Sequence, residues 1–505
     1  MNELHLIAVA FYVIALAGLL VYGQNALALV WAHWRKRAAG GAPPPATDDL
    51  PVVTVQLPLY NERYVAARLL DAVASLDYPR ERLEIQVLDD STDDTPAIVA
   101  HVVATLKVRG LDVTHIRRRQ RTGFKAGALS EGLARARGEY IAIFDADFVP
   151  PPDLLRRLLP SFGPDVACVQ ARWGHLNRRY SALTRAQAMT IDSHFAEQAA
   201  RARGGVYTSF DGTAGIWRKA AIVDAGGWSA ETLTEDLELS YRVQLRGWRI
   251  VQRPDVECAA ELPVLVSALK IQQRRWAWGT TQTAVKLLLT VLATPLGPWK
   301  RYQACMHLTS WLIHPCALAA VVLTPVVFLQ PGAWLGALAG PVVVVGLLGP
   351  VAQAAYAQWI LGTSWRRILL DLPAAVIVAA GLTYSTSLAV VAALVLRRPP
   401  DWARTPKFGI AGTAGTWRGK GYTQRAPWTT LVELALGAYC ARSAWGLADS
   451  QIALAAVLFL FAVGFVTVGV LTVAQSLGIA CESAGVATRV RAATDRSAAV
   501  HARAA

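Results

Sequence analysis

The chain has 505 residues, of which 54% are hydrophobic and 17% charged, and its mean hydropathy is +0.33. It is too apolar for a purely soluble protein and too charged for a membrane bundle alone, so we expect one soluble and one membrane domain. The net charge of +14 could suggest nucleic-acid binding, but the basic residues gather beside apolar segments, as in Arg35-Lys36-Arg37. This placement is typical of cytoplasmic membrane anchors and predicts no nucleic-acid partner.

The N-terminal segment is almost entirely apolar from Leu4 to Trp31 and ends at the basic cluster. It is longer than the apolar region of a cleavable signal peptide and lacks a basic start. We therefore expect residues 1–37 to form a transmembrane helix with its N-terminus outside, followed by a Gly/Pro/Ala-rich linker over residues 38–50.

Residues 51–279 combine short β-branched runs with helical stretches, a pattern that predicts an α/β domain with a mostly parallel sheet and helices on both faces. The expected strands cover residues 52–57, 84–88, 112–116, 140–144 and 166–169. Asp89-Asp90 and Asp145-Ala146-Asp147 each follow a strand directly. Since ligands of open α/β sheets bind at the carboxyl ends of strands, both clusters are placed at a candidate nucleotide site.

The C-terminal half is apolar again, and residues 280–475 are expected to hold interfacial and transmembrane helices. Candidate spans cover residues 307–329, 334–355, 428–446 and 451–473. Residues 368–396 are also long enough, but a crossing there would place the basic loop of residues 397–427 outside. We therefore interpret residues 368–396 as an interfacial or re-entrant element, which gives five spans in total and a cytoplasmic tail over residues 476–505.

Asp145 and Asp147 are candidate metal ligands, because Mg²⁺ and Mn²⁺ are commonly held by one or two carboxylates together with a nucleotide diphosphate. The alternative for this pair alone is a solvated turn or a helix cap. Asp145 would also contact the nucleotide sugar. The remaining nucleotide-sugar candidates from this part of the chain are Tyr60, Asn61, Glu62, Asp89, Asp90 and Lys125.

Asp236, with Glu235 beside it, is the candidate catalytic group, although a helix also begins here and could be capped by these residues. Direct displacement at a sugar needs a base that takes the proton of the acceptor hydroxyl. Further along, Gln272, Arg275 and Trp276 offer a guanidinium for a diphosphate and an indole face for a sugar ring. The alternative for this last group is an ordinary basic-aromatic membrane anchor.

In this order the clusters resemble the D, D, D, Gln-x-x-Arg-Trp pattern of processive family 2 glycosyltransferases, the group of cellulose, chitin and hyaluronan synthases. Longer phrases, such as Ala142 to Phe148 and Gly212 to Arg218, are similar to cellulose synthase-like enzymes that make mannan, glucomannan or the xyloglucan backbone. The resemblance implies a GT-A (Rossmann-like) catalytic domain beside an α-helical transmembrane domain. It also implies inversion at the anomeric carbon and a β-1,4-linked product.

Residue by residue, the resemblance implies that Asp89 and Asp90 contact the nucleotide and that Asp236 is the base. It implies that Trp276 holds the acceptor end, and that the acceptor pocket is lined by Phe210, Asp211, Gly212 and Thr213. The implied cofactor is Mg²⁺ or Mn²⁺, the implied donor GDP-mannose or UDP-glucose, and the other partners a growing polysaccharide and the lipid bilayer. The expected location is a bacterial inner membrane, with a cytoplasmic catalytic domain.

Two departures and one competing function remain. The candidate gating loop at Lys407 to Ile410 is not followed by the Thr-x-Lys ending of cellulose synthases, and the tail is too short for their cyclic-dinucleotide-binding β-barrel. The alternative function is a lipid glucosyltransferase that adds one sugar to a ceramide or polyprenyl-type acceptor, which product size would distinguish. A non-catalytic scaffold would need a lost motif residue, and none is missing.

Overall fold

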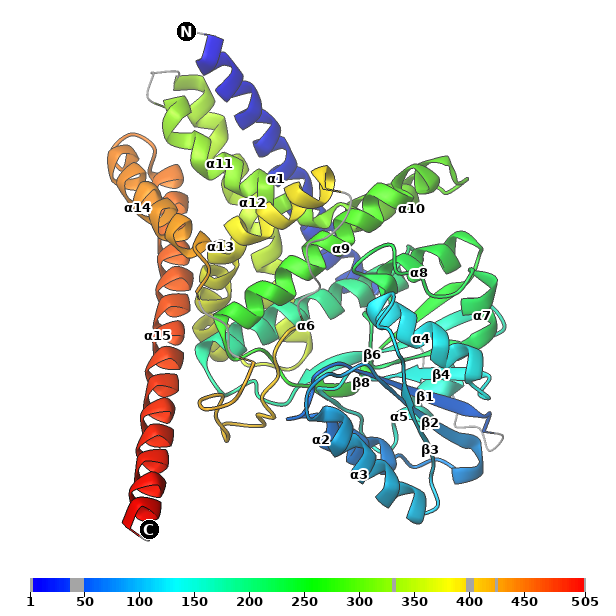
Figure 1. The fold of residues 1–505 in the computed structure, drawn as a ribbon. Coiled ribbons are helices and arrows are strands. Elements are labelled where there is room, and N and C mark those ends of the chain that lie inside the picture. Colours follow the sequence, from blue (N-terminus) through cyan, green and yellow to red (C-terminus); the bar gives the residue numbers. More distant parts are fainter. Residues whose placement is uncertain (1–2, 37–49, 329–332, 397–403, 423–425, 504–505) are drawn as a thin grey trace.

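The computed structural model describes residues 3–36, 50–328, 333–396, 404–422 and 426–503. The predicted linker lies almost entirely outside these ranges, as do the two ends of the basic loop, residues 397–403 and 423–425. Figure 1 shows an α/β domain on one side and a group of long helices on the other, with the two parts joined through α6, α9 and α13.

The α/β domain is built on one eight-stranded sheet in the order β3-β2-β1-β4-β7-β6-β8-β5. The first four strands of this order run parallel, and β7 is antiparallel to both β4 and β6. The strands are β1 (Val53–Leu59), β2 (Leu83–Asp89), β3 (Asp112–Arg117), β4 (Tyr140–Ile143), β5 (Phe148–Val149), β6 (Val166–His175), β7 (Gly215–Arg218) and β8 (Arg249–Ala260). The predicted α/β architecture is confirmed, and all five expected strands are present.

Helices cover the sheet and account for the apolar character of its strands. The strands β1, β2 and β4 are buried on both faces and therefore read as nearly continuous apolar runs. The helices of this domain are α2 (Ala66–Ala74), α3 (Thr95–Val108), α4 (Phe124–Arg135), α5 (Leu154–Leu158), α6 (Ala182–Arg203), α7 (Lys219–Asp224), α8 (Glu235–Leu245) and α9 (Val266–Ala293).

The remaining helices are mostly apolar. They are α1 (Glu3–Lys36), α10 (Pro298–Leu308), α11 (Ile313–Phe328), α12 (Ala333–Ile360), α13 (Trp365–Val395), α14 (Thr429–Leu447) and α15 (Ile452–Arg503). Within the described residues, five segments are long and apolar enough to cross a membrane: Glu3–Arg35, Ser310–Phe328, Leu338–Ile360, Trp365–Val395 and Ile452–Gly478. The number agrees with the expectation, but the set contains α13 instead of α14.

The difference between α13 and α14 has a simple origin. Helix α14 carries Glu433 and Arg442 and is less apolar than the five segments, whereas α13 is one continuous helix of 31 residues. A re-entrant element turns back within the membrane, so the continuous course of α13 contradicts that part of the interpretation. Both ends of α13 nevertheless contact helices of the α/β domain. Near its start, Arg185 of α6 lies 2.8 Å from Asp371, and near its end Val390 packs against Trp278 of α9.

A buried ion pair fixes α9 to the apolar helices. The Lys270 ammonium lies 2.6 Å from the Glu433 carboxylate of α14 and donates to the Thr472 hydroxyl of α15 at 3.0 Å. The side chains of Lys270 and Glu433 are only 7% and 1% exposed. Since Gln272 follows two residues later on α9, this ion pair anchors the part of the helix that carries the predicted Gln-x-x-Arg-Trp cluster.

Candidate active site

A cleft opens at the carboxyl ends of β1 and β4, with about 1260 Å³ of empty space when the part open to solvent is included. Its walls come from segments far apart in sequence, including the starts of α8 and α9 and the loop after α13. The predicted residues that line it are Tyr60, Glu62, Asp90, Lys125, Asp145, Asp147, Asp211, Gly212, Glu235, Asp236, Gln272, Arg275 and Trp276.

Four predicted residues are not part of the cleft wall: Asn61, Asp89, Phe210 and Thr213. Asp89 is buried, and its carboxylate accepts from the Ser91 amide and contacts His115 Nε2, both at 2.9 Å; although burial acts in the opposite direction, these bonds lower its pKa. Asn61 accepts from the Thr92 amide at 2.8 Å. The Thr213 hydroxyl accepts from the Asp145 amide at 2.9 Å, and Phe210 packs on a neighbouring indole. Of these four residues, Thr213 bonds directly to a residue of the cleft wall, Asp145. The ligand contacts expected for all four stay predictions.

Asp90 and Tyr60, which are expected to contact the nucleotide sugar, are each held by an arginine. Arg118 Nε donates to one oxygen of Asp90 at 2.9 Å and a second guanidinium nitrogen donates to the other, which is a bidentate pair. The Arg121 guanidinium lies 3.4 Å from the centroid of the Tyr60 ring and itself lines the cleft. The sequence analysis missed Arg121, although the basic run that follows β3 is a signal for it.

The two carboxylates expected to hold a metal diphosphate, Asp145 and Asp147, each lie beside an ammonium group. Lys125 Nζ lies 2.6 Å from Asp145 and also donates to the Gly212 carbonyl at 2.9 Å, while Lys407 Nζ lies 2.6 Å from Asp147. Within the described part of the chain, no group of three or more His, Cys, Asp or Glu side chains could hold a metal by itself. Two carboxylates that face one cleft fit Mg²⁺ or Mn²⁺ when phosphate oxygens of a substrate complete the coordination.

The candidate base is placed in a tight and poorly solvated position. Burial and the neighbouring Glu235 carboxylate raise the pKa of Asp236 to about 8, with Lys125 acting in the opposite direction. Gly212, in the left-handed region at φ +85°, brings its backbone so close that an added Cβ would lie 2.6 Å from Asp236 Oδ2. Only glycine fits this position without displacing the carboxylate.

Two indole side chains line the cleft near the residues expected to bind the acceptor. Trp276 of α9 and Trp173 of β6 both line the cleft, and their ring centroids are 6.3 Å apart with the planes inclined by 52°. Aromatic faces suit the apolar faces of sugar rings, so this part of the cleft can hold a carbohydrate. Trp173 is not among the residues predicted from the sequence, since a lone tryptophan in a strand carries no local sign of a ligand contact.

The loop after α13 folds over the cleft and is anchored by one buried carboxylate. Glu261 accepts from the Phe408 amide at 2.7 Å and from the Ile410 amide at 2.9 Å, and Arg68 pairs with it at 3.1 Å. The loop thereby places Thr405 and Lys407 in the cleft wall.

The expectation that this loop lacks a Thr-x-Lys sequence needs correction. Thr405-Pro406-Lys407 has that spacing just before Phe408, whereas the sequence analysis looked for it after Ile410. Next to it, Arg404 lies 2.8 Å from Glu62; burial raises the pKa of the Glu62 carboxyl to about 8 even though Arg404 opposes the shift.

We expect Glu261→Ala to release this loop while the α/β domain stays folded, because the backbone amides of residues 408 and 410 would lose their acceptor. Limited proteolysis should then cleave within residues 404–422 about tenfold faster than in the wild-type protein, the factor that corresponds to ~1.4 kcal/mol. Glu257→Ala, which removes a half-exposed carboxylate from β8, is the matched control. Equal cleavage rates in all three proteins would contradict the anchoring role of Glu261.

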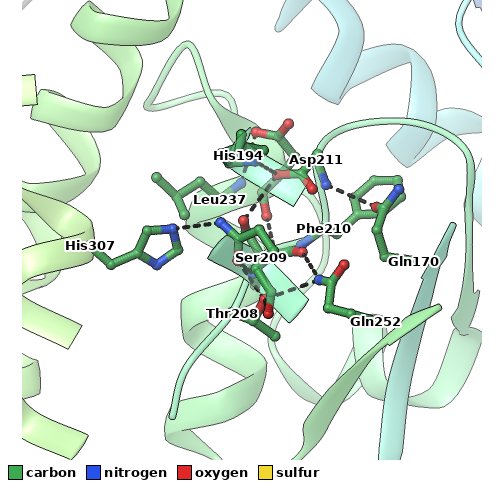
Figure 2. A network of polar contacts seen from close by, with 12 residues as sticks. Gln170, His194, Thr208, Ser209, Phe210, Asp211, Leu237, Gln252 and His307 are labelled. Atoms are coloured by element: carbon green, nitrogen blue, oxygen red, sulfur yellow. Dashed lines mark hydrogen bonds and ion pairs between the residues drawn. The ribbon is translucent and has the colours of Figure 1, made fainter. Parts of the chain in front are cut away.

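Behind the base, a polar network holds the segment Thr208 to Asp211 (Figure 2). Gln252 donates to the Ser209 carbonyl at 2.7 Å, and Gln170 accepts from the Asp211 amide at 3.0 Å. The Phe210 amide donates to the Ser240 hydroxyl at 2.9 Å. These bonds fix the turn that carries Asp211 and Gly212 into the cleft.

The chain is similar to known glycosyltransferases over its α/β part. Residues 51–279 match the family model described as "Glycosyltransferase like family 2". Glucomannan 4-beta-mannosyltransferase 2 of Arabidopsis thaliana is 41% identical over 286 residues, which are 54% of this chain and 54% of that protein. Glucomannan 4-beta-mannosyltransferase 1 of Oryza sativa subsp. japonica is 40% identical over 263 residues, or 50% of each chain. The chain thus spans about half the length of these curated relatives.

Among solved structures, the mannosyltransferase PcManGT from Pyrobaculum calidifontis, described as a complex with GDP-Man and Mn²⁺, has 22% sequence identity and a TM-score of 0.48, covering 78% of this chain and 98% of that one. The expected GT-A-like α/β domain with additional long apolar helices agrees with the family match. The curated relatives are plant proteins, so they give no support to the expected bacterial inner membrane.

Proposed function

We propose that this chain, whose residues 51–279 match the model of glycosyltransferase family 2, is a membrane-embedded, inverting and processive β-1,4-mannosyltransferase that builds mannan or glucomannan from GDP-mannose. The observation that carries the proposal is that one cleft unites the paired carboxylates, a buried candidate base and the Arg275-Trp276 pair. The names of the plant relatives favour mannose over glucose as the sugar that is transferred.

The reaction follows from the positions of these groups. A hydroxyl of the terminal acceptor sugar attacks the anomeric carbon of the donor, the bond from that carbon to the diphosphate oxygen breaks, and Asp236 takes the hydroxyl proton. Lys125, Arg275 and Lys407 line the cleft and stabilise the negative charge of the departing diphosphate. Asp145 and Asp147 would hold Mg²⁺ or Mn²⁺, which supplies further charge neutralisation when bound.

The membrane arrangement of this proposal has α1, α11, α12, α14 and α15 crossing the bilayer, with α13 at the interface. It is supported by the contacts of both ends of α13 with helices of the α/β domain, and by the docking of the next loop in the cleft. A crossing α13 would carry that loop to the opposite side of the bilayer. The basic end of α1 supports a cytoplasmic position for the catalytic domain, because Lys and Arg gather on the cytoplasmic side of membrane helices.

Membranes that contain this protein should incorporate label from radioactive GDP-mannose, with Mg²⁺ or Mn²⁺ present, into ethanol-insoluble material that a β-mannanase releases. Asp236→Asn serves as the negative control. Label from UDP-glucose that only a β-1,4-glucanase releases would contradict the choice of donor. Label that extracts into organic solvent would favour the lipid glucosyltransferase, which transfers a single sugar.

A further inference from the structure

We infer that the ion pair of His194 and Asp211 sets how strongly Asp236 holds a proton: Asp211 strengthens the base by its negative charge, and His194 limits that effect. Both would be positioning residues that act through Asp236. The inference rests on the proposed function, in which Asp236 is the base of the transfer reaction.

Asp211 is held next to the base by the backbone. It lines the same cleft as Asp236, and the following residue, Gly212, makes the close approach to Asp236 Oδ2 described above. The amide of Asp211 donates to Gln170 Oε1 at 3.0 Å, which fixes the turn from the opposite side. The carboxylate therefore cannot leave the neighbourhood of Asp236 without breaking this network.

The two oxygens of Asp211 have different surroundings, as Figure 2 shows for one side of the carboxylate. Oδ1 contacts His194 Nε2 at 2.9 Å and accepts from the Ser209 hydroxyl at 3.1 Å. Oδ2 is buried and has no hydrogen-bond partner among the described residues. Among the described residues, His194 is the ion-pair partner of Asp211. The like charge of Asp211 near Asp236 makes ionisation of Asp236 less favourable.

The other charged groups around the pair are few and are already engaged. Asp236 faces Glu235 and Lys125 besides Asp211, and Lys125 is bound to Asp145. His194, on α6, faces Glu197, Arg201 and His307 of α10 in addition to Asp211. Although burial acts in the opposite direction, the Asp211 carboxylate raises the pKa of His194. The His194 side chain is 44% exposed, so it exchanges protons with water, and the charged pair exists below its pKa.

Two substitutions should therefore move the pH dependence of the reaction in opposite directions. Asp211→Asn removes the negative charge, so the acidic limb of the pH profile of kcat should shift to lower pH by about one unit, the order expected for one nearby charge. His194→Gln removes the positive charge, keeps a donor for Asp211, and should shift the same limb to higher pH. A damaged fold would not produce opposite shifts.

The test is the pH profile of mannose transfer for the wild type, for both variants, and for His101→Gln, which removes an exposed histidine from the distant helix α3. Calorimetric binding of GDP-mannose confirms that each variant is folded. Limbs that coincide with the wild type, or that move in the same direction, would overturn the inference. A wild-type protein without transferase activity would instead overturn the proposed function itself.

Discussion

Asp236→Asn should lower the rate of mannose transfer by about 10²- to 10⁴-fold, the range typical for the loss of a general base. Asparagine has nearly the same shape but cannot take the hydroxyl proton. Asp236 forms no ion pair with Lys125, and only the weaker charge coupling between the two groups connects it to donor binding, so donor affinity depends on it far less than the transfer step does. The Kd for GDP-mannose should change by less than about threefold, or ~0.65 kcal/mol.

Single-turnover transfer and calorimetric donor binding, measured on the same preparations, separate these two effects. Asp224→Asn, which removes an exposed carboxylate at the end of α7, is the matched control and should retain wild-type activity. A transfer rate of Asp236→Asn within about tenfold of the wild type, below the range for a general base, would remove Asp236 from that role.

Lys270→Met should destabilise the protein by about 3–5 kcal/mol, the cost of leaving one partner of a buried ion pair uncompensated. The variant leaves the Glu433 carboxylate, only 1% exposed, without its ammonium partner. Thermal unfolding in detergent should show a lower Tm. Transfer activity should also fall at temperatures where the protein is still folded, because the same contact anchors the start of α9.

The double variant Lys270→Met/Glu433→Leu distinguishes a lost charge balance from a simple loss of packing. It removes both charges and fills the space with apolar atoms, so it should recover most of the lost stability. A double variant that is no more stable than Lys270→Met would show that the ion pair itself is not the origin of the effect.

The sequence predicted those parts of the site whose residues directly follow a recognisable strand. Asp90, Asp145 and Asp147 follow buried strands, and the edge of a parallel sheet brings such residues together regardless of the distant chain. Adjacent residues at the end of a strand point to opposite sides, but the sequence does not show which of Asp89 and Asp90 faces the cleft. One faces the cleft and the other a histidine on β3.

Contacts between segments that are distant in the chain could not be predicted from local sequence patterns. The position of Lys407 depends on bonds from its loop to Glu261, a residue 146 positions away that no local pattern marks. In the same way, β5, β7 and β8 were not predicted, since their places in the sheet are set by pairing with strands distant in sequence. Length and hydropathy alone likewise place α13 among the candidate spans, and only its contacts argue for a different position.

Lys125 has a thermodynamic consequence for the whole site. Its single ammonium group binds Asp145 on the diphosphate side and the Gly212 carbonyl on the side of the base, and it lies 3.8 Å from Glu235. A donor diphosphate that attracts this ammonium withdraws positive charge from Asp236, which then binds its proton more tightly. Linkage is reciprocal, so protonation of Asp236 must strengthen donor binding by the same factor. Binding of the nucleotide sugar would thus be accompanied by proton uptake at Asp236, and dissociation of the nucleoside diphosphate by proton release.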